Sequence, residues 1–183
     1  MKNKQIQTVY FGGGTPSLVS SENYKKIFEE LGKHLDLSEV KEVTMEANPD
    51  DLTPEYLASI NSLPFNRLSI GIQSFHNDDL KWMNRRHDGQ QADDCITHAK
   101  DHGFNNITID LIYGFPLLTA KKLEQNIERV MKHDIKHISA YHLMVEPGSV
   151  FYNWQKVGKI RELTHESRAW KHFLVLKNSL KKY

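Results

Sequence analysis

The sequence predicts an α/β protein built on a parallel sheet, and three observations support this prediction. Short apolar runs rich in β-branched residues alternate with segments of helical periodicity along the whole chain. Such repeated strand-helix units imply a parallel sheet with right-handed crossovers. With 183 residues, of which 39% are hydrophobic, the chain is long enough to bury a core of its own. We therefore expect a single domain over residues 1–183.

Five runs are predicted as strands: Thr8–Phe11, Glu42–Ala47, Leu68–Ser74, Ile107–Tyr113 and His137–Met144. In four of them every second residue is small or polar, as in Ser69, Gly71 and Gln73. Because side chains alternate along a strand, each of these sets lies on one face of the sheet. A sheet buried on both faces has near-continuous apolar strands, so this polar face indicates a ligand-lining surface at the carboxyl ends of the strands.

The segments between the strands carry the start and stop signals of helices. Residues with capping side chains stand before the helical segments: Ser20, Thr53, Asn77, Thr119 and Thr164. Gly103 is a suitable stop for the helix that follows Ala92. The last helix carries Trp170 and Phe173, which we expect in the core. Five such units are too few for a closed eight-stranded barrel of about 250 residues, which leaves an open, partial barrel or a doubly wound sheet.

Composition narrows the classes of function. A net charge of +1 without a basic run predicts no nucleic-acid partner. No apolar stretch approaches the roughly 20 residues of a membrane span, and residues 1–5 lack the apolar core of a secretory signal, so we expect a cytoplasmic protein. The single cysteine, Cys95, excludes an internal disulfide and a multi-cysteine metal site within this chain.

A glycine-rich turn follows the first predicted strand, in the run Tyr10–Ser17. Without Cβ atoms, Gly12, Gly13 and Gly14 can adopt φ values that other residues avoid and can let a ligand approach the backbone closely, while Thr15 adds a hydroxyl. The alternative is a sharp turn without a ligand. The three glycines alone do not decide between these interpretations.

Five motifs together resemble the oxygen-independent coproporphyrinogen III oxidase group of radical S-adenosylmethionine (SAM) proteins. In chain order they are Phe11–Ser17, Glu46–Pro49, Asn66–Phe75 with Asn84-Arg85 beyond it, Asp110–Pro116, and Tyr141–Gly148. The resemblance runs from about Thr8 to Trp154. It implies an α/β partial (open) TIM-like barrel of the radical SAM type, SAM as ligand, and a [4Fe-4S] cluster held by a CxxxCxxC loop after the first strand of the family.

Carried over by motif, the family's SAM contacts fall on eight residues: Gly13, Gly14, Thr15, Glu46, Gln73, Arg85, Asp110 and Met144. Carboxylates can accept from the ammonium or the ribose hydroxyls of SAM, and an arginine offers a planar fork to its carboxylate. The alternatives are structural. Arg85 can be a surface arginine beside Arg86, and the two carboxylates can be buried with a partner of their own.

The sequence departs from the family pattern at the cluster loop. No cysteine lies near the first predicted strand, and Cys95 falls in a predicted helix far along the chain. Three thiolates are needed to hold the cluster and leave one iron open for SAM. We therefore expect a fragment that lacks the first strand unit and the cluster loop, with the cluster present only in a full-length parent protein and no radical chemistry in this chain alone. An edge strand over Thr8–Phe11 would then favour self-association.

Two functions remain open for the parent protein within this family. One is the haem chaperone branch, which binds haem and delivers it to acceptor proteins, including a possible membrane-protein acceptor. The other is a true oxidase that decarboxylates coproporphyrinogen III to protoporphyrinogen IX. Ser17-Leu18 and Ser74 favour the chaperone branch, on the expectation that they lie where a second ligand would press against SAM. A weaker alternative outside the family is a barrel enzyme that binds a phosphorylated metabolite at Gly12–Gly14.

Overall fold

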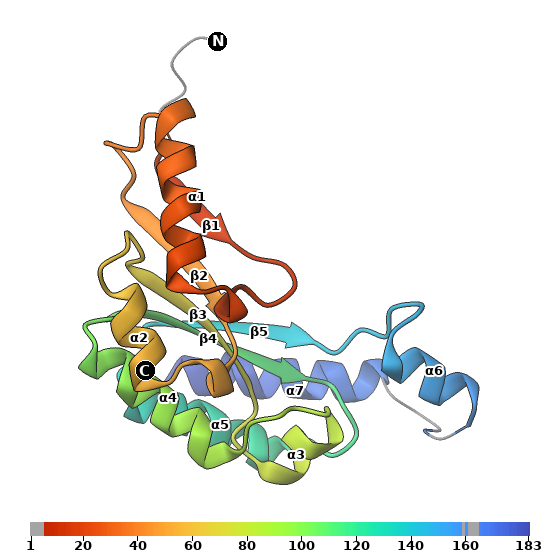
Figure 1. The fold of residues 1–183 in the computed structure, drawn as a ribbon. Helices are drawn as coiled ribbons and strands as arrows, with labels where there is room; N and C mark the ends of the chain where they lie inside the picture. Colours follow the sequence, from red (N-terminus) through yellow and green to blue (C-terminus); the bar gives the residue numbers. More distant parts are fainter. Residues whose placement is uncertain (1–5, 159, 161–164) are drawn as a thin grey trace.

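The computed structural model describes residues 6–158, 160 and 165–183. Its centre is a five-stranded parallel sheet, shown in Figure 1, with the order β1-β2-β3-β4-β5. The strands are β1 (Thr8–Phe11), β2 (Glu42–Ala47), β3 (Arg67–Gln73), β4 (Asn106–Tyr113) and β5 (His137–His142). All five predicted strands are therefore confirmed, with ends that differ from the predicted ends by two residues at most.

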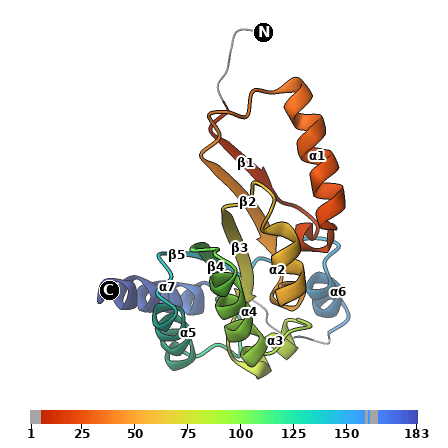
Figure 2. The same ribbon diagram turned by 60° about the vertical axis from the view of Figure 1, so that its left-hand side comes forward.

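In the described part of the chain, one or two α-helices stand between successive strands, and two more follow β5. They are α1 (Ser21–His34), α2 (Pro54–Ile60), α3 (Asn77–Trp82), α4 (Gly89–Asp101), α5 (Ala120–Lys132), α6 (Val150–Lys156) and α7 (Glu166–Leu180). Two short 3₁₀ helices, at Pro16–Leu18 and Pro49–Asp51, are the next elements after β1 and β2. Figure 2 shows how this helical layer follows the twist of the sheet.

The strand order decides between the two predicted architectures. A doubly wound sheet reverses its strand order at a switch point, where its connections change from one face to the other. Here the order rises steadily from β1 to β5, and every neighbouring pair is parallel. The fold is therefore an open, partial TIM-like barrel.

The core lies between the sheet and the helices. Met45 of β2, Leu68 and Ile70 of β3 and Ile109 of β4 are fully buried on the helical side of the sheet. The helices contribute Tyr24, Leu57, Ile96 and Val130 to the same cluster. The alternate positions of these strands face the other way, and they carry the small and polar residues of the predicted polar face.

The helix ends confirm most of the predicted caps. The side chains of Ser20, Thr53 and Thr119 each accept a hydrogen bond from a backbone N–H of the first turn. Gly103, with φ of +87°, follows α4 as predicted. Asn77 was wrongly predicted as a cap of its own helix: its Oδ1 instead accepts from the backbone N–H of Gly89 at 2.7 Å. The fifth predicted cap, Thr164, lies outside the described residues.

The core prediction was wrong for Trp170 and Phe173, which are 61% and 42% exposed. Their rings stack on each other on α7, with centroids 5.5 Å apart. Helix α7 instead buries His172, Leu176 and Ser179. Periodicity places residues on a shared helix face but does not say which face meets the core.

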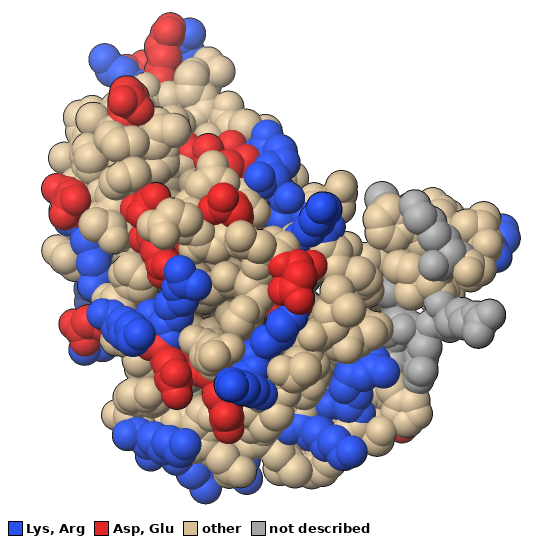
Figure 3. Space-filling model, turned by 90° about the horizontal axis from the view of Figure 1, so that it is seen from below, with Lys and Arg blue, Asp and Glu red and all other residues tan. Residues whose placement is uncertain are grey.

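On the face of the molecule shown in Figure 3, basic and acidic side chains are interspersed.

Candidate functional site

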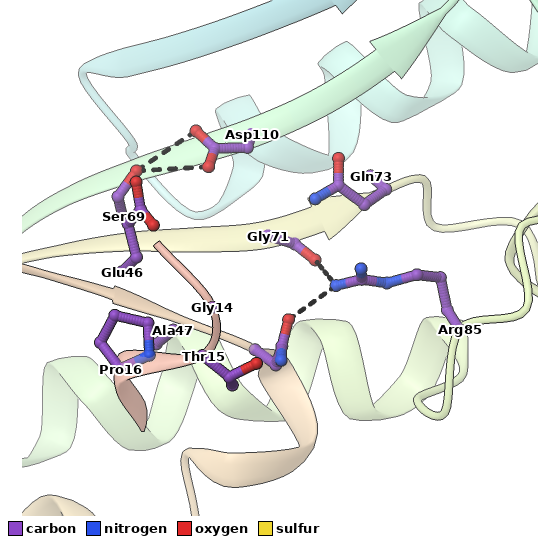
Figure 4. A pocket seen from close by; sticks show the side chains of 11 residues that line it. Gly14, Thr15, Pro16, Glu46, Ala47, Ser69, Gly71, Gln73, Arg85 and Asp110 are labelled. Carbon is purple, nitrogen blue, oxygen red and sulfur yellow. Dashed lines mark hydrogen bonds between the residues drawn. The ribbon is translucent and has the colours of Figure 1, made fainter. Parts of the chain in front are cut away.

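A hollow at the carboxyl ends of β1, β2, β3 and β4 gathers most of the residues predicted to bind a ligand. Its lining, shown in Figure 4, is Gly14, Thr15, Pro16, Glu46, Ala47, Asn48, Ser69, Gly71, Gln73, Arg85 and Asp110. Six of the eight predicted residues are in this lining. A seventh, Gly13, stands beside it in the glycine turn and contacts Glu46 through its backbone.

Met144 does not belong to this group. Strand β5 ends at His142, two residues earlier, and the side chain of Met144 is 71% exposed. The sequence expectation extended the strand to this residue, and the earlier end of the strand leaves it in the following loop. Met144 is absent from the lining of the hollow.

Glu46 holds the glycine turn against the sheet. Its Oε1 accepts a hydrogen bond from the Tyr10 hydroxyl at 2.8 Å, and its Oε2 accepts from the backbone N–H of Gly13 at 3.1 Å. Gly13 and Gly14 have φ values of +82° and +59°, which residues that carry a Cβ rarely adopt. Burial and the Glu46 carboxylate raise the pKa of Tyr10 to about 12, so Tyr10 stays a neutral donor.

A second carboxylate, Asp110 of β4, faces the same hollow. The Ser69 hydroxyl lies 3.3 Å from both of its carboxylate oxygens. Burial raises the pKa of Asp110 despite the hydrogen bonds from Ser69 and Ser139, and the nearby charge of Glu46 raises it further. Two carboxylates in one partly buried site favour a cationic ligand, since a positive charge would offset both the burial and the mutual repulsion.

Arg85 is the cation of the site. Its Nη2 donates to Asn48 Oδ1 at 2.8 Å and to the carbonyl oxygen of Gly71 at 3.1 Å. Burial lowers the pKa of the guanidinium, and no carboxylate among the described residues lies within ion-pair distance of it. The neighbouring Arg86 points outward, where it pairs with Asp50 and Asp51. The surface interpretation offered for Arg85 therefore describes Arg86 instead.

Gln73 reaches the hollow through an irregularity in the sheet. The register between β3 and β4 shifts between Ile70 and Gln73, and Gln73 has φ of +66°. A non-glycine residue in this region costs about 1–3 kcal/mol and is found where the surrounding structure imposes it, often at functional sites. The shift turns the Gln73 amide toward the hollow (Figure 4).

Sequence reasoning did not name every residue of the lining as a ligand contact. Ser69 and Gly71, four and two positions before Gln73 in β3, were placed only on the polar, ligand-lining face, and the structure puts both in the lining. Asn48, which follows β2 directly, holds Arg85 in place. A Cβ at Gly71 would lie 2.8 Å from Gln73 Nε2, so the bare glycine leaves room for that amide.

The two serines used to favour the chaperone branch do not line the hollow. Ser17 is 3% exposed, and its hydroxyl donates to Asp51 Oδ2 at 2.6 Å. Ser74 is fully buried, and its hydroxyl donates to Asp79 Oδ2 at 2.9 Å. Both serine side chains are bonded within the fold and are absent from the lining of the hollow, whereas Leu18 is exposed.

The hollow takes part of a ligand rather than enclosing a whole one. Its volume is about 130 Å³, whereas pockets for drug-sized ligands measure roughly 300–1,000 Å³. The acidic side chains of Glu46 and Asp110 also disfavour phosphate there, and the N–H of Gly13 is already bonded to Glu46. The hollow therefore suits the cationic and hydroxyl-bearing parts of a ligand better than a phosphate group.

The residues of this chain do not fit an iron-sulfur cluster. Its one cysteine, Cys95, is buried in α4, where its thiol donates to the carbonyl oxygen of Ala92, and burial raises its pKa. Within the described ranges, no three His, Cys, Asp or Glu side chains are grouped to hold a metal ion. The same part of the chain contains no helix of the length and apolarity needed to span a membrane.

The fold and the site define a class of ligand-binding α/β proteins: open parallel barrels with a polar, glycine-edged site at the carboxyl ends of the strands. Sequence comparison then places the chain within one family of that class. Residues 1–130 match the model of the Radical SAM superfamily. The chain belongs to this superfamily.

Known relatives narrow the type. The heme chaperones HemW of Lactococcus lactis subsp. lactis (strain IL1403) and Bacillus subtilis (strain 168) are 36% and 37% identical to this chain, over 91% and 93% of its residues. The chain spans 44% and 45% of their respective lengths. The structure of coproporphyrinogen III oxidase HemN from Escherichia coli superposes with a TM-score of 0.83 at 23% identity, covering 98% of this chain and 41% of that one. The chain is therefore a radical SAM protein that is similar in sequence to HemW and in fold to HemN.

Proposed function

We propose that this chain binds SAM in the hollow between the glycine turn and β4, as the SAM-binding part of a haem chaperone of the radical SAM superfamily. The observation that supports this most directly is the convergence of two carboxylates, one amide and one unpaired arginine from four separate chain segments. Together these four side chains match three groups of SAM: its ammonium, its carboxylate and its ribose hydroxyls.

The proposed roles follow from the geometry. Glu46 accepts from the ammonium of SAM and keeps the glycine turn in place through Gly13. Asp110 and Gln73 take the ribose hydroxyls, since both side chains can accept a hydrogen bond there. Arg85 offers the free edge of its guanidinium to the SAM carboxylate. Gly14 and Thr15 cover the ligand from the turn.

The [4Fe-4S] cluster belongs to the family and would come from outside this chain, because the chain has no set of cysteines to hold it. Binding and orienting SAM is the part of the function that these residues can perform.

Calorimetric titration of the purified chain with SAM tests the proposal. Glu46→Gln and Arg85→Gln should each weaken binding about tenfold or more, because each removes a charge-assisted hydrogen bond. Arg86→Gln, one residue away but outside the hollow, and Glu29→Gln, on the exposed side of α1, are the matched controls. Equal SAM affinity in all four variants would contradict the proposed site.

The haem chaperone assignment is supported by the HemW relatives and is tested separately. In a protein that carries this segment together with a reconstituted cluster, we expect tight haem uptake, without anaerobic decarboxylation of coproporphyrinogen III in the presence of SAM and a reductant. Robust formation of protoporphyrinogen IX would overturn the chaperone assignment in favour of the oxidase. We also propose a cytoplasmic location, with a membrane protein as a haem acceptor.

We further propose that the chain self-associates through β1. Among the described residues, β1 pairs on one side only, with β2, which leaves the backbone groups of its other edge open for another chain. Thr8→Lys places a charge on this edge and should lower the apparent mass in light scattering at high protein concentration. A wild-type chain that stays monomeric under those conditions would contradict the proposal.

A further inference from the structure

A second hollow lies between the amino-terminal ends of α5 and α7 and shares no lining residue with the SAM site. Its volume is about 390 Å³. The lining is Ala120, His165, Ser167, Arg168, Lys171 and His172. No carboxylate of the described part of the chain lines it, so every ionisable side chain around this hollow is basic.

Arg168, in the first turns of α7, is the unusual residue of this hollow. Its Nη1 atom is buried and has no hydrogen-bond partner among the described residues. A buried donor that lacks a partner costs free energy, and the cost is larger for a charged group. Among the described residues the fold gives this donor no acceptor, which points to an acceptor supplied by a ligand.

The residues that line the hollow around Arg168 add positive potential, and Glu166, the acid in the first turn of α7, lines a different hollow. Ala120 is the first residue of α5, so the positive end of that helix dipole borders the hollow. The first turn of α5 contains no acidic residue, although helices are usually stabilised by acids there. Lys171, one turn along α7 from Arg168, is exposed on the same side. An anion in this hollow would be attracted by the amino-terminal end of α5, by Arg168 and by Lys171.

His172 forms the buried wall of the hollow and is not free to bind a ligand. Its Nδ1 accepts from the backbone N–H of Gly114 at 3.1 Å, and it also hydrogen-bonds to the backbone of Leu118. Burial, together with the charge of Arg168, lowers the pKa of His172. The imidazole thus anchors α7 to the loop after β4 as a neutral group, one turn along the same face of the helix from Arg168.

We propose that this hollow binds an oxyanion, either phosphate or the carboxylate of a larger ligand, held by the guanidinium of Arg168 and the ammonium of Lys171. The site is independent of the proposed SAM site. A weaker alternative from the sequence placed a phosphate at Gly12–Gly14. This hollow suits an anion better, because the carboxylates of Glu46 and Asp110 border the glycine turn whereas no described carboxylate borders this hollow.

Calorimetric titration of the whole chain with inorganic phosphate, and with succinate as the carboxylate arm, tests the proposal at constant ionic strength maintained with potassium chloride. Arg168→Gln should weaken binding of the preferred anion about tenfold or more, since it removes a charge-assisted contact. Lys171→Gln should weaken binding about threefold, because Lys171 is exposed and more strongly screened. Lys177→Gln, the same change on the last turn of α7, is the matched control and should bind like the wild type.

The outcomes separate the possibilities. Phosphate binding without succinate binding identifies a phosphate site, and the reverse identifies a carboxylate site; both support the proposal when Arg168→Gln or Lys171→Gln weakens the binding. If Arg168→Gln does not fold, the exposed Lys171→Gln variant decides alone. The proposal fails if neither anion binds, if Lys177→Gln lowers affinity as much as Lys171→Gln, or if only Arg85→Gln abolishes binding, which would place the anion at the glycine turn.

Discussion

Gly71 gives the sharpest test of the candidate SAM site, because one methyl group there reaches the hollow while leaving the core untouched. Gly71 lies on β3, with its missing side chain directed between Gln73 and Arg85. In Gly71→Ala the new Cβ would stand 2.8 Å from Gln73 Nε2, 3.4 Å from Arg85 Nη2 and 3.7 Å from the carbonyl oxygen of Ala47. The methyl thus displaces the Gln73 amide and narrows the approach to the guanidinium.

The expected cost to folding is small. Glycine within a strand is less favourable than alanine by about 0.5–1 kcal/mol, because the unfolded chain loses more freedom. The closest contact is with the far end of the flexible Gln73 side chain, which can turn aside. We expect the free energy of unfolding to stay within about 1 kcal/mol of the wild-type value, because the lower entropy of the unfolded alanine variant offsets the steric crowding at the new methyl group.

The expected cost to binding is larger. The added methyl occupies part of a hollow of only about 130 Å³ and shifts one of its polar groups. A loss of SAM affinity of about tenfold or more, equivalent to about 1.4 kcal/mol, should follow. Calorimetric titration with SAM and urea denaturation of the same preparation measure the two effects together.

Gly32→Ala is the matched control. Gly32 lies in α1, and a Cβ there would meet no atom within 4 Å. This variant should gain about 1 kcal/mol of stability from helix propensity and bind SAM like the wild type. The reasoning is refuted if Gly71→Ala folds normally and keeps the wild-type affinity, since the methyl would then lie where the ligand does not reach.

Three further predictions concern the same region. Gln73→Gly relieves a backbone at φ of +66° and should keep or raise the free energy of unfolding by up to about 1 kcal/mol while weakening SAM binding; a loss of stability in denaturation would contradict this. Asp110→Asn should raise stability at neutral pH and flatten its pH dependence. Folding raises the pKa of Asp110, so between its ordinary pKa and its raised pKa the folded state binds more protons than the unfolded state, and the free energy of unfolding falls as pH rises through that range. Wild-type and variant curves of stability against pH that run parallel would refute this prediction. Ser17→Ala removes a buried hydroxyl that donates to Asp51 and accepts from the N–H of Asn48, and should lower the free energy of unfolding in urea by about 1–3 kcal/mol. The folded fraction of this variant should bind SAM with wild-type affinity.

The sequence by itself determined where the five strands lie along the chain, the face of the sheet that is polar, and most of the helix caps; the order of the strands in the sheet came from the structure. These features depend on local patterns. Alternation with a period of two assigns Glu46, Ser69 and Asp110 to one face, and Thr119 caps α5 through a hydrogen bond to a residue three positions away. Parallel strands then bring their carboxyl ends to one edge, so the gathering of the predicted residues there was also foreseeable.

Only the tertiary structure decided how individual side chains are used. Arg85 and Arg86 are adjacent, so local sequence patterns do not distinguish them. Their distant partners do: Asn48 and Gly71 turn Arg85 inward, while Asp50 and Asp51 hold Arg86 at the surface. The positive φ of Gln73 arises from the register shift against β4, which no property of its own neighbours in sequence reveals. Long-range contacts select among conformations that are locally close in free energy, and for that reason they cannot be derived from local periodicity.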